Sequence, residues 1–418
     1  MISIIGSTGS IGVQALNVAR HNNLRVEALV AHSNIDLLFE QVKEFNPQFV
    51  GIIDKSNEKK AVQLFSGLKT KPTLVFGTQA LVFSCKLPKV KTILISVTGI
   101  DGIYPLIEGL KSGKTIALAN KESVVIGGEY LLGQVNNGGL SGKIIPVDSE
   151  HSSIFQSLIG AIDTVKAADL SRLAKPPKPI NTAKTAKPPK PINALALQVP
   201  NNVDKLILTA SGGAFYQSPK SKLKQLSQSD IFHPNWKMGK KITLDSCTMM
   251  NKALEIIEAK WLFGTTQIDY CIHPDSIFHS FINFNDGVSI AHASTPNMFL
   301  PIQFALTGQS RPPSNLPPIA LDKPLSFIPK NEDTFFAPAL AKQAILSDTN
   351  FYSIVLNAAN DAATNLFFND KISFLNILSI TKNALNKFQI QDTKTLEQII
   401  SLHKFVTDKI NIEYRLFI

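Results

Sequence analysis

The sequence is poor in cysteine and has no long apolar run. Its 418 residues include only Cys85, Cys247 and Cys271, which form no CxxC motif. A disulfide framework is therefore not expected, and a reducing compartment is favoured. No apolar stretch reaches the roughly 18 residues that a membrane-spanning helix needs. Met1 is followed at once by the strand-like residues 2–5, so we expect no signal or transit peptide and a cytoplasmic protein.

Acidic residues are missing from one stretch that carries much of the positive charge. Between Arg172 and Lys190 lie six basic residues and no acid, and without them the formal net charge of +10 falls to +4. The excess is local, so it gives little reason to expect a nucleic-acid partner. The same stretch repeats AKPPKPIN at 174–181 and 186–193. We interpret residues 171–199 as a duplicated surface insertion, with binding of an SH3-like partner or of an anionic surface as the alternative.

The first part of the chain alternates strand-like and helix-like segments. With 44% apolar residues, the chain is long enough for two or three domains with substantial cores. The strand-like runs are residues 2–5, 25–30, 48–52, 73–76, 92–97, 115–118 and 143–147, and helix-length stretches such as 35–45 and 104–111 lie between them. This alternation predicts an α/β fold with a doubly wound parallel sheet, which binds ligands beyond the carboxyl ends of its strands.

The first strand is followed by a glycine-rich turn, residues 6–12 (GSTGSIG). Glycines let the backbone approach a pyrophosphate at a helix N-terminus, although they could serve only a tight turn. The end of the second strand, residues 31–34 (AHSN), lacks the acid that usually binds the ribose of NAD. A carboxylate there would repel a 2′-phosphate, so its absence favours NADPH.

Polar groups follow two later strands. Residues 118–123 (LANKES) close one strand and open a helix, where they could bind a ligand or serve as an ordinary helix start. Asp148 and Glu150 end the next strand two residues apart and would point the same way if extended. Two carboxylates that face one site need a cation or a proton between them, and oxygen ligands suit Mg²⁺ or Mn²⁺. The alternative is a polar strand end capped by Asp148. A third carboxylate at the same place, Glu255, would favour the metal site.

Residues 233–261 are the most informative stretch. A loop, HPNWKMG (233–239), precedes a strand-like run at 242–244 and an amphipathic helix expected from Asp245 or Ser246. The helix would bring Ser246, Asn251, Lys252 and Glu255 near its N-terminus, where the macrodipole and the Lys252 ammonium favour an anion. A phosphate-and-metal corner is one interpretation, and a capped surface helix is the other.

The remaining segments set the expected domains. Residues 211–213 (SGG) form a turn that could bind phosphate or act as a hinge, 285–287 (NDG) predicts a hairpin, and 309–333 is rich in proline. Four helix-like stretches follow residue 334. We expect a nucleotide-binding domain at 1–147, a catalytic domain at 148–309, a linker at 310–333 and a helical domain at 334–418.

Six motifs in this order, GSTGSIG, LANKES, PVDSEH, SGG, HPNWKMG and DSCTMMNKALE, resemble the 1-deoxy-D-xylulose 5-phosphate reductoisomerases over most of the chain. The resemblance implies a Rossmann-like N-terminal domain, a central domain with a lid loop, NADPH, one Mn²⁺ or Mg²⁺ ion, a phosphorylated sugar substrate and a homodimer. It implies an NADPH contact for Thr8, Gly9, Ser10, Ile11, His32, Ser33, Asn34, Asn120, Glu122 and Gly239. Asp148, Glu150 and Glu255 would bind the metal.

By the same resemblance, four residues would bind the substrate phosphate: Ser211, Ser246, Asn251 and Lys252. The carbon backbone would contact Lys121, Ser149 and His233, while Trp236 and Met238 would belong to the lid. His151 and His273 match family histidines with either a structural or a functional role. Two departures stand out: Ser33 is neutral where the family often has Lys or Arg, and the insertion at 171–199 is longer than expected.

The implied reaction is an isomerisation followed by reduction with NADPH, which yields 2-C-methylerythritol 4-phosphate. Lys121, Glu150 and Glu255 are the candidate catalytic residues, with Glu150 expected to carry a proton. Two alternatives stay open on the sequence alone. One is a semialdehyde- or homoserine-dehydrogenase type of enzyme, which needs no metal site of three carboxylates. The other is a redox-sensing or scaffold protein that binds NADPH without turnover.

Overall fold

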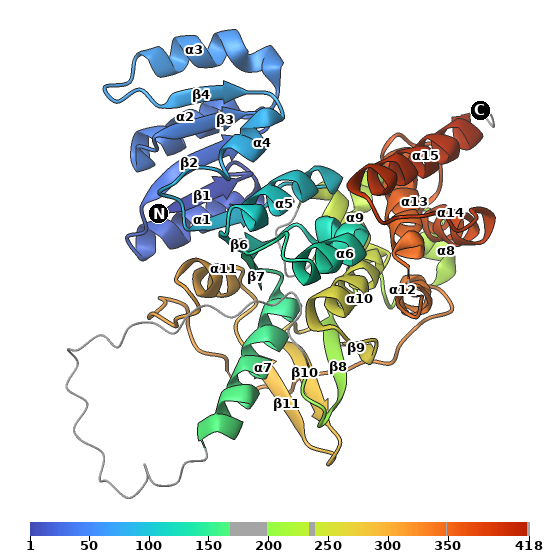
Figure 1. Cartoon of the computed structure of the whole chain (residues 1–418). Helices are drawn as coiled ribbons and strands as arrows, with labels where there is room; N and C mark the ends of the chain where they lie inside the picture. The colour runs from blue at the N-terminus through green and yellow to red at the C-terminus, as the bar shows by residue number, and fades with distance from the viewer. Residues whose placement is uncertain (168–198, 234–238, 321, 348, 416–418) are drawn as a thin grey trace, which may run out of the picture.

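A seven-stranded parallel sheet forms the N-terminal part of the chain (Figure 1). The computed structural model describes residues 1–167, 199–233, 239–320, 322–347 and 349–415. The strand order is β4-β3-β2-β1-β5-β6-β7, so the chain winds outward from β1 in both directions. The strands are β1 (Ile2–Ile5), β2 (Val26–Ala31), β3 (Phe49–Ile52), β4 (Thr73–Phe76), β5 (Thr92–Ile95), β6 (Thr115–Leu118) and β7 (Lys143–Pro146). The predicted doubly wound sheet is confirmed.

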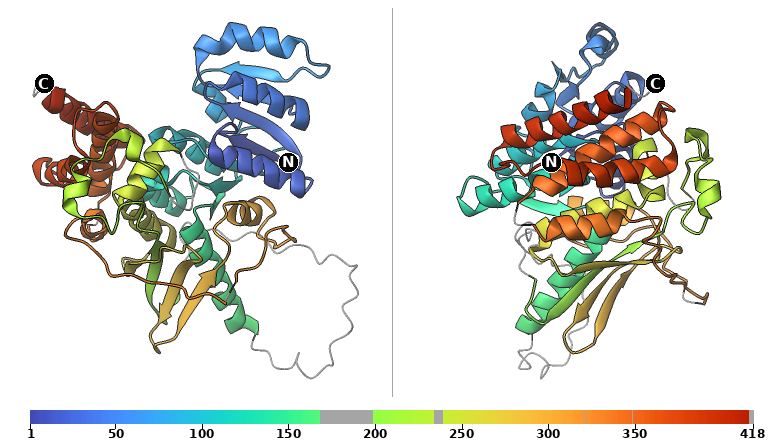
Figure 2. Two further views of the ribbon diagram at one scale, coloured as in Figure 1. Left: turned by 180° about the vertical axis from the view of Figure 1, so that it is seen from behind. Right: turned by 90° about the vertical axis from the view of Figure 1, so that its right-hand side faces the viewer.

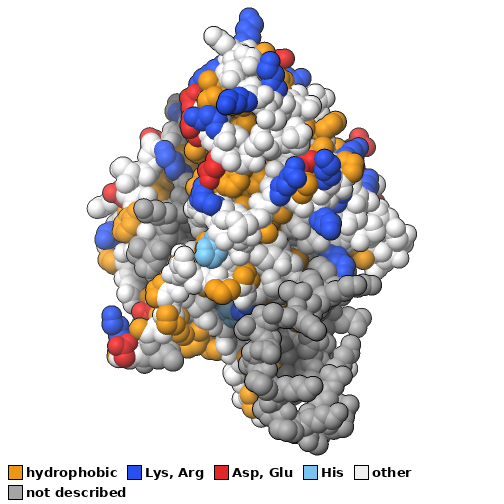
Figure 3. All heavy atoms as spheres, turned by 90° about the vertical axis from the view of Figure 1, so that its left-hand side faces the viewer, with side chains coloured by type: hydrophobic (Ala, Val, Ile, Leu, Met, Phe, Trp, Pro, Cys, Tyr) orange, Lys and Arg blue, Asp and Glu red, His pale blue; other side chains and the backbone are white. Residues whose placement is uncertain are grey.

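Helices connect these strands and cover the sheet. They are α1 (Ser10–His21), α2 (Ile35–Phe45), α3 (Glu58–Ser66), α4 (Gln79–Phe83), α5 (Ile103–Lys111), α6 (Lys121–Asn136) and α7 (Ser149–Ala167). The strands β1, β2 and β3 are buried throughout, as expected when both faces of a parallel sheet are covered. On the face shown in Figure 3, basic side chains are interspersed with acidic ones. Exposed ion pairs in the N-terminal part of the chain include Arg20–Glu44 and Lys60–Asp36.

A second, four-stranded sheet lies beyond the first, with α7 against it (Figure 1). Its order is β11-β10-β8-β9, in which β8 and β9 are parallel and the other pairs are antiparallel. The strands are β8 (Val203–Ala210), β9 (Ile268–Ile272), β10 (Phe278–Phe284) and β11 (Ser289–Ala293). The hairpin predicted around Asp286 is confirmed, because β10 and β11 flank that turn.

The C-terminal part is helical, as predicted, and it packs against α6 and α10 (Figure 2). After α8 (Lys220–Leu223), α9 (Lys240–Cys247), α10 (Met250–Phe263) and α11 (Phe299–Leu306), the chain forms α12 (Ala337–Ile345), α13 (Phe351–Phe368), α14 (Phe374–Lys387) and α15 (Leu396–Arg415). In the described part of the chain, no helix is both long and apolar enough to cross a membrane.

Helix α10 is the central element of the molecule. It packs against α6 and α12. Met250, Leu254, Ile257 and Trp261 form an apolar stripe at helical spacing, and all four are buried. The contact with α6 is close: a Cβ on Gly128 would lie 2.1 Å from Cγ of Trp261. The two helices also meet where they begin, because Lys121, the first residue of α6, donates to Asn251 and Glu255 of α10.

Two local predictions are wrong. Residues 242–244 are not a strand but lie in α9, because the buried Leu244 and Cys247 form an apolar helical face and Lys241 pairs with Asp245 one turn later. The expected helix start at Asp245 or Ser246 is also wrong. The chain breaks instead at Met249, which adopts a left-handed conformation (φ 63°), and α10 begins at Met250.

Candidate active site

A cavity of about 290 Å³ opens at the carboxyl edge of the large sheet, between that sheet, β8 and α10. Its position fits the rule that doubly wound sheets bind ligands beyond their strand ends. The predicted site residues that line it are Ser10, Ile11, Lys121, Asp148, Ser149, Glu150, Ser211, His233, Ser246, Asn251, Lys252 and Glu255. Segments far apart in the sequence thus meet at one cavity.

Three carboxylates converge in this cavity. Asp148 follows β7, Glu150 lies in the first turn of α7, and Glu255 lies in α10. One oxygen of each lies within 4.8 Å of the others. The extended Asp148–Glu150 geometry expected from the sequence is wrong, because α7 begins at Ser149 and turns the Glu150 side chain back toward the strand end. The set of hard oxygen donors fits Mg²⁺ or Mn²⁺.

Two lysines stand against these carboxylates. The Lys121 ammonium lies 2.5 Å from Asp148 and 2.8 Å from Glu255. The Lys252 ammonium lies 2.6 Å from Glu150 and also pairs with Glu255. Glu255, 0% exposed, therefore bridges both cations. Because three acids face two bases, the cluster keeps an excess of negative charge.

The pKa values of the cluster follow from burial and from these pairs. Burial alone would raise the pKa of Asp148, but the neighbouring Lys121 charge lowers it to about 2. Burial and the Glu150 charge raise the pKa of Glu255. Burial opposes the charged form of Lys121, yet Asp148 and Glu255 hold its pKa well above the usual value. Asp148 is therefore ionised and Lys121 protonated at neutral pH.

Small polar groups also line the cavity. Ser211 follows β8, Ser246 lies in the last turn of α9, and Asn251 lies in the first turn of α10. The Ser211 hydroxyl is 3.0 Å from Nε2 of His233, and burial lowers the pKa of His233 to about 4. His233 is therefore neutral at pH 7. Asn251 donates to Glu255, four residues later on the same face of α10, and accepts from Lys121 at 2.7 Å.

The glycine-rich turn of residues 6–12 enters the cavity from the large sheet, with Ser10 and Ile11 in its lining. Gly9 is the N-cap of α1, and Thr8 lies just before it. A Cβ on Gly12 would lie 2.1 Å from the carbonyl oxygen of Gly6, so the turn could not close with a larger residue there. Gly9 and Ser10 are exposed, so the backbone beside the helix N-terminus is open to a ligand.

Most of the other predicted NADPH contacts follow strands β2 and β6 of the large sheet. His32, Ser33 and Asn34 are exposed after β2, and the Asn34 side chain caps α2 by accepting from the Leu37 N–H at 3.2 Å. Buried Asn120 donates to the carbonyl of Val97 at 3.0 Å and to Glu122 at 2.8 Å. Gly239 is the N-cap of α9. The predicted lid residues, Trp236 and Met238, lie outside the described residues, as does most of the insertion at 171–199.

The two further histidines have structural partners. His151, 0% exposed, places Nε2 2.9 Å from the Glu255 carbonyl oxygen and Nδ1 3.4 Å from the Glu258 carboxylate. It therefore ties α7 to α10 directly behind the carboxylate cluster. His273 places Nδ1 2.7 Å from the Ser326 carbonyl oxygen and stacks on Phe327.

Sequence reasoning missed several lining residues, including Thr209, His279 and Asn297. Thr209 directly precedes the predicted Ser211 turn, so extending that motif by two residues would have found it. His279 lies within β10 and Asn297 precedes α11, and neither has a motif around it. Only the pairing of β10 with β8 brings His279 to the cavity.

Comparison with known proteins agrees with this geometry. Three family models match: 1-deoxy-D-xylulose 5-phosphate reductoisomerase over residues 2–128, its C-terminal domain over 190–263, and the DXP reductoisomerase C-terminal domain over 293–408. The reductoisomerase of Clostridium perfringens is 36% identical over 99% of both chains. The chain belongs to the 1-deoxy-D-xylulose 5-phosphate reductoisomerase family.

Another family member, from Acetivibrio thermocellus, is 38% identical over 96% of each chain. A solved DOX-P reductoisomerase in complex with NADPH, fosmidomycin and magnesium superposes with a TM-score of 0.85 at 31% identity, covering 100% of this chain and 98% of that one. The Zymomonas mobilis reductoisomerase in complex with NADPH has a TM-score of 0.81 at 27% identity, over 99% and 98% of the two chains. Family membership decides against both alternatives that the sequence left open.

Proposed function

We propose that this chain converts 1-deoxy-D-xylulose 5-phosphate into 2-C-methyl-D-erythritol 4-phosphate with NADPH and a divalent metal ion. The observation that carries the proposal is the meeting of three carboxylates and two lysines beside the glycine-rich turn in one cavity. The structures to which this chain is similar are named as complexes with NADPH and magnesium. The chain is thus an NADPH-dependent oxidoreductase that also isomerises its substrate.

Asp148, Glu150 and Glu255 would hold the metal ion. Their oxygens are close enough to share one ion, and their excess negative charge favours a cation. When bound, Mg²⁺ or Mn²⁺ supplies a Lewis acid that polarises the carbonyl and the adjacent hydroxyl of the substrate. The His151 contact to the Glu255 carbonyl keeps that part of α10 in place from behind.

The substrate phosphate would lie against Ser211, Ser246, Asn251 and Lys252. These residues come from the end of β8, the last turn of α9 and the first turn of α10. The dipole of α10 favours an anion there, and Lys252 can exchange a carboxylate partner for a phosphate oxygen. Binding energy from this remote group would hold the reacting carbons in position.

Lys121 and Glu150 would handle the charge and proton at the reacting carbons. Lys121 is protonated and lies at the metal-binding carboxylates, so it can donate to a substrate oxygen that gains negative charge. Ser149 donates to Glu150 at 2.5 Å and can orient that carboxylate as the proton carrier. Neutral His233 can accept or donate a hydrogen bond to the substrate without adding charge.

NADPH would occupy the glycine-rich turn and the adjoining strand ends. Thr8, Gly9, Ser10 and Ile11 would receive its pyrophosphate, and His32, Ser33 and Asn34 its adenosine phosphate, because these segments follow β1 and β2. When bound, NADPH supplies the hydride that reduces the rearranged aldehyde. Closure of a lid by Trp236 and Met238 over the substrate remains part of the proposal.

The proposal extends to domains, assembly and compartment. The division at 1–147, 148–309, 310–333 and 334–418 is supported by the two sheets and the C-terminal helices. A homodimer is supported by β11, an edge strand with Val288 and Ile290 exposed beside it and on it. A cytoplasmic location is supported by three cysteines that are all free.

One spectrophotometric assay tests the reaction. NADPH absorbance at 340 nm should fall when 1-deoxy-D-xylulose 5-phosphate is added to the protein with Mn²⁺ or Mg²⁺. The fall should stop with excess chelator and return when the metal is restored. Folded, metal-loaded protein that leaves NADPH unchanged would refute the proposal, and oxidation that survives complete chelation would refute the metal assignment.

A further inference from the structure

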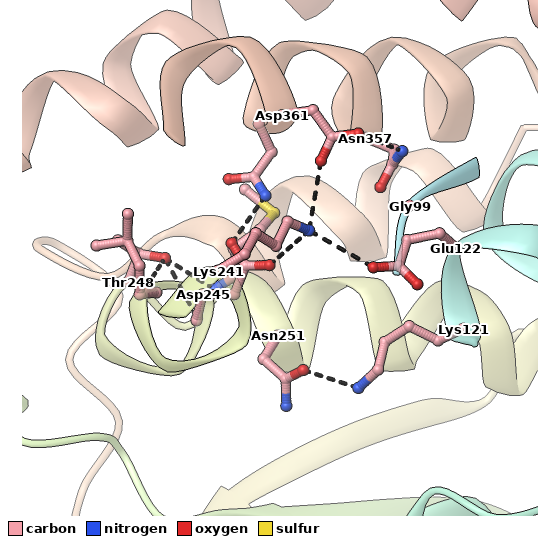
Figure 4. A network of polar contacts seen from close by, with 12 residues as sticks. Gly99, Lys121, Glu122, Lys241, Asp245, Thr248, Asn251, Asn357 and Asp361 are labelled. Carbon is pink, nitrogen blue, oxygen red and sulfur yellow. Dashed lines mark hydrogen bonds and ion pairs between the residues drawn. The ribbon is translucent and has the colours of Figure 1, made fainter. Parts of the chain in front are cut away.

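A second ionic cluster lies behind the cavity, centred on Lys241 (Figure 4). The Lys241 ammonium lies 2.7 Å from the Asp245 carboxylate, 3.4 Å from that of Asp361 and 3.7 Å from that of Glu122. We call these four residues the Lys241 cluster. Glu122 is on α6, Asp245 shares α9 with Lys241, and Asp361 is on α13. One lysine thus joins three helices.

Neighbouring side chains tie the cluster to the C-terminal helices. Asn360 of α13 donates to Asp245 at 2.9 Å, and Asn357 of the same helix donates to Asp361 at 3.3 Å. His403 of α15 lies 3.3 Å from Asp361. On the other side, Asn120 donates to Glu122 at 2.8 Å. The network therefore runs without a break from α15 to the first turn of α6.

Two carboxylates of the Lys241 cluster are buried and depend on their protein partners. Asp245 is 2% exposed and Glu122 is 6% exposed, so neither carboxylate can replace its partner with water. Burial would lower the pKa of Lys241, but the nearby Asp245 and Asp361 charges raise it instead. The Lys241 and Asp361 side chains are 25% and 24% exposed. Removing Lys241 would leave the buried Asp245 and Glu122 carboxylates without a compensating charge, which favours a shift of the helices that carry them.

The cluster lies between elements that carry site residues, whereas the C-terminal helices supply none. Helix α9 begins next to Gly239 and has Ser246 in its last turn, and α6 begins with Lys121 directly before Glu122. Among the described residues, none beyond Met298 lines the cavity. Any influence of α13 on the chemistry must therefore pass through contacts such as the Lys241 cluster.

We propose that Lys241 and Asp361 are positioning residues for the reaction: they lock α9 to α6 and α13 so that Ser246 and Lys121 face the same substrate. The inference rests on the proposed function, because it assigns Ser246 to the phosphate and Lys121 to the reacting end. Neither Lys241 nor Asp361 lines the cavity, so neither touches the substrate there. Their effect is on geometry, and misplacing a binding group by about 1 Å can cost about 100-fold in rate.

The test compares Lys241→Met, Lys241→Arg and Asp361→Asn with the unchanged protein. We expect Lys241→Met and Asp361→Asn to lower kcat/KM by about 10- to 100-fold, with a higher KM for the phosphorylated substrate. Mn²⁺ affinity should stay within about threefold, because the metal carboxylates lie in other elements. Lys241→Arg keeps the charge and should recover most of the activity.

A matched control separates positioning from stability. Asp269 lies 2.5 Å from Lys342 and 2.7 Å from Lys330, so it forms an ion cluster of its own between β9 and α12. Asp269→Asn should lower the melting temperature and leave the kinetic constants unchanged. Folded Lys241→Met and Asp361→Asn proteins with kinetic constants within twofold of the unchanged protein would overturn the proposal. Asp361→Asn is isosteric, so it provides the test if Lys241→Met does not fold.

A binding measurement distinguishes failure of this inference from failure of the proposed function. Inorganic phosphate and NADPH can be titrated calorimetrically into each protein without turnover. If the unchanged protein binds both but shows no reaction, the reaction assignment is wrong. Phosphate binding weakened by about tenfold or more in Asp361→Asn, but not in Asp269→Asn, would then still support positioning. Equal binding in all variants would refute it.

Discussion

Replacing Glu255 with glutamine should separate metal binding from folding. Glu255 is buried between Lys121 and Lys252, and one of its oxygens lies within 4.8 Å of oxygens of Asp148 and Glu150. Glutamine keeps the shape of the side chain and removes only its charge. We therefore expect Glu255→Gln to weaken metal binding strongly while the metal-free protein folds as before.

The size of the metal effect follows from the charge lost. A pair of unit charges 4 Å apart contributes about 4 kcal/mol at an effective dielectric constant of about 20, and the metal ion carries two charges. Part of this is offset, because the amide oxygen can still coordinate and repulsion from Glu150 is relieved. A net loss of about 3 kcal/mol corresponds to roughly 100-fold weaker binding or more. Turnover should fall in proportion to the loss of bound metal when the metal concentration is below the new dissociation constant.

The substitution weakens metal binding but should not destabilise the metal-free protein. Burial and the Glu150 charge raise the pKa of Glu255 above its unfolded value, so the fold disfavours the ionised carboxylate. This penalty is present at pH 7 and disappears as the pH falls through the folded and then the unfolded pKa. Lys121 keeps Asp148 and Lys252 keeps Glu150 after the substitution. In chelator, the melting temperature of Glu255→Gln should therefore equal or exceed that of the unchanged protein.

The assay is calorimetric titration of Mn²⁺ together with thermal unfolding in chelator. Glu258→Gln is the matched control: Glu258 is one turn later on α10, 1% exposed, and grouped with Asp148 and His151 instead. Its effect on Mn²⁺ affinity should be less than tenfold. Metal affinity of Glu255→Gln within threefold of the unchanged protein would refute the reasoning, and an equal loss in Glu258→Gln would place the ion in the other group.

Three further predictions concern the phosphate, pH and packing. Lys252→Ala should raise the KM for the phosphorylated substrate at least tenfold more than that for NADPH, and equal rises would contradict the phosphate site. Burial lowers the pKa of His279 to about 4, so the unfolding free energy measured in urea should fall as the pH drops from 6.5 toward 4. His279→Gln should reduce the dependence of this free energy on pH by up to about 1.4 kcal/mol per pH unit. An unchanged pH dependence in His279→Gln would contradict this prediction. Gly128→Ala should lower the unfolding free energy by about 1–3 kcal/mol, because the new Cβ would lie 2.1 Å from the Trp261 ring. Gly133→Ala should not lower it, because no atom lies near that position. Equal urea midpoints of the two variants would contradict the packing argument.

Most of the fold was predictable, because the hydrophobic pattern of each segment agrees with the helix or strand that it forms in the folded chain. Residues 35–45 form the predicted helix with the predicted bounds, and the alternation of strands and helices gave the parallel sheet. Residues 242–244 show where this agreement ends. Their β-branched side chains favour a strand, but burial of Leu244 on a helical face decides for α9.

The site was predictable where residue type alone carries the chemistry. Asp148, Glu150 and Glu255 are acids that only a cation or proton could bring together, and the structure places them within reach of one ion. Asp361 could not have been found in this way, because it lies 3.4 Å from Lys241 only after α13 has packed across α6. Long-range packing of this kind leaves no local pattern in a sequence.

The length of α7 separates the lysine- and proline-rich repeat from the cavity. This helix begins at the cavity with Ser149 and Glu150 and extends 19 residues to Ala167, or about 28 Å at 1.5 Å per residue. The lysine- and proline-rich repeat is therefore joined to the protein at the end of α7 that lies farthest from the reacting groups. A change of chain length at this junction would leave Glu150 in place, so α7 acts as a spacer between the repeat and the reacting groups.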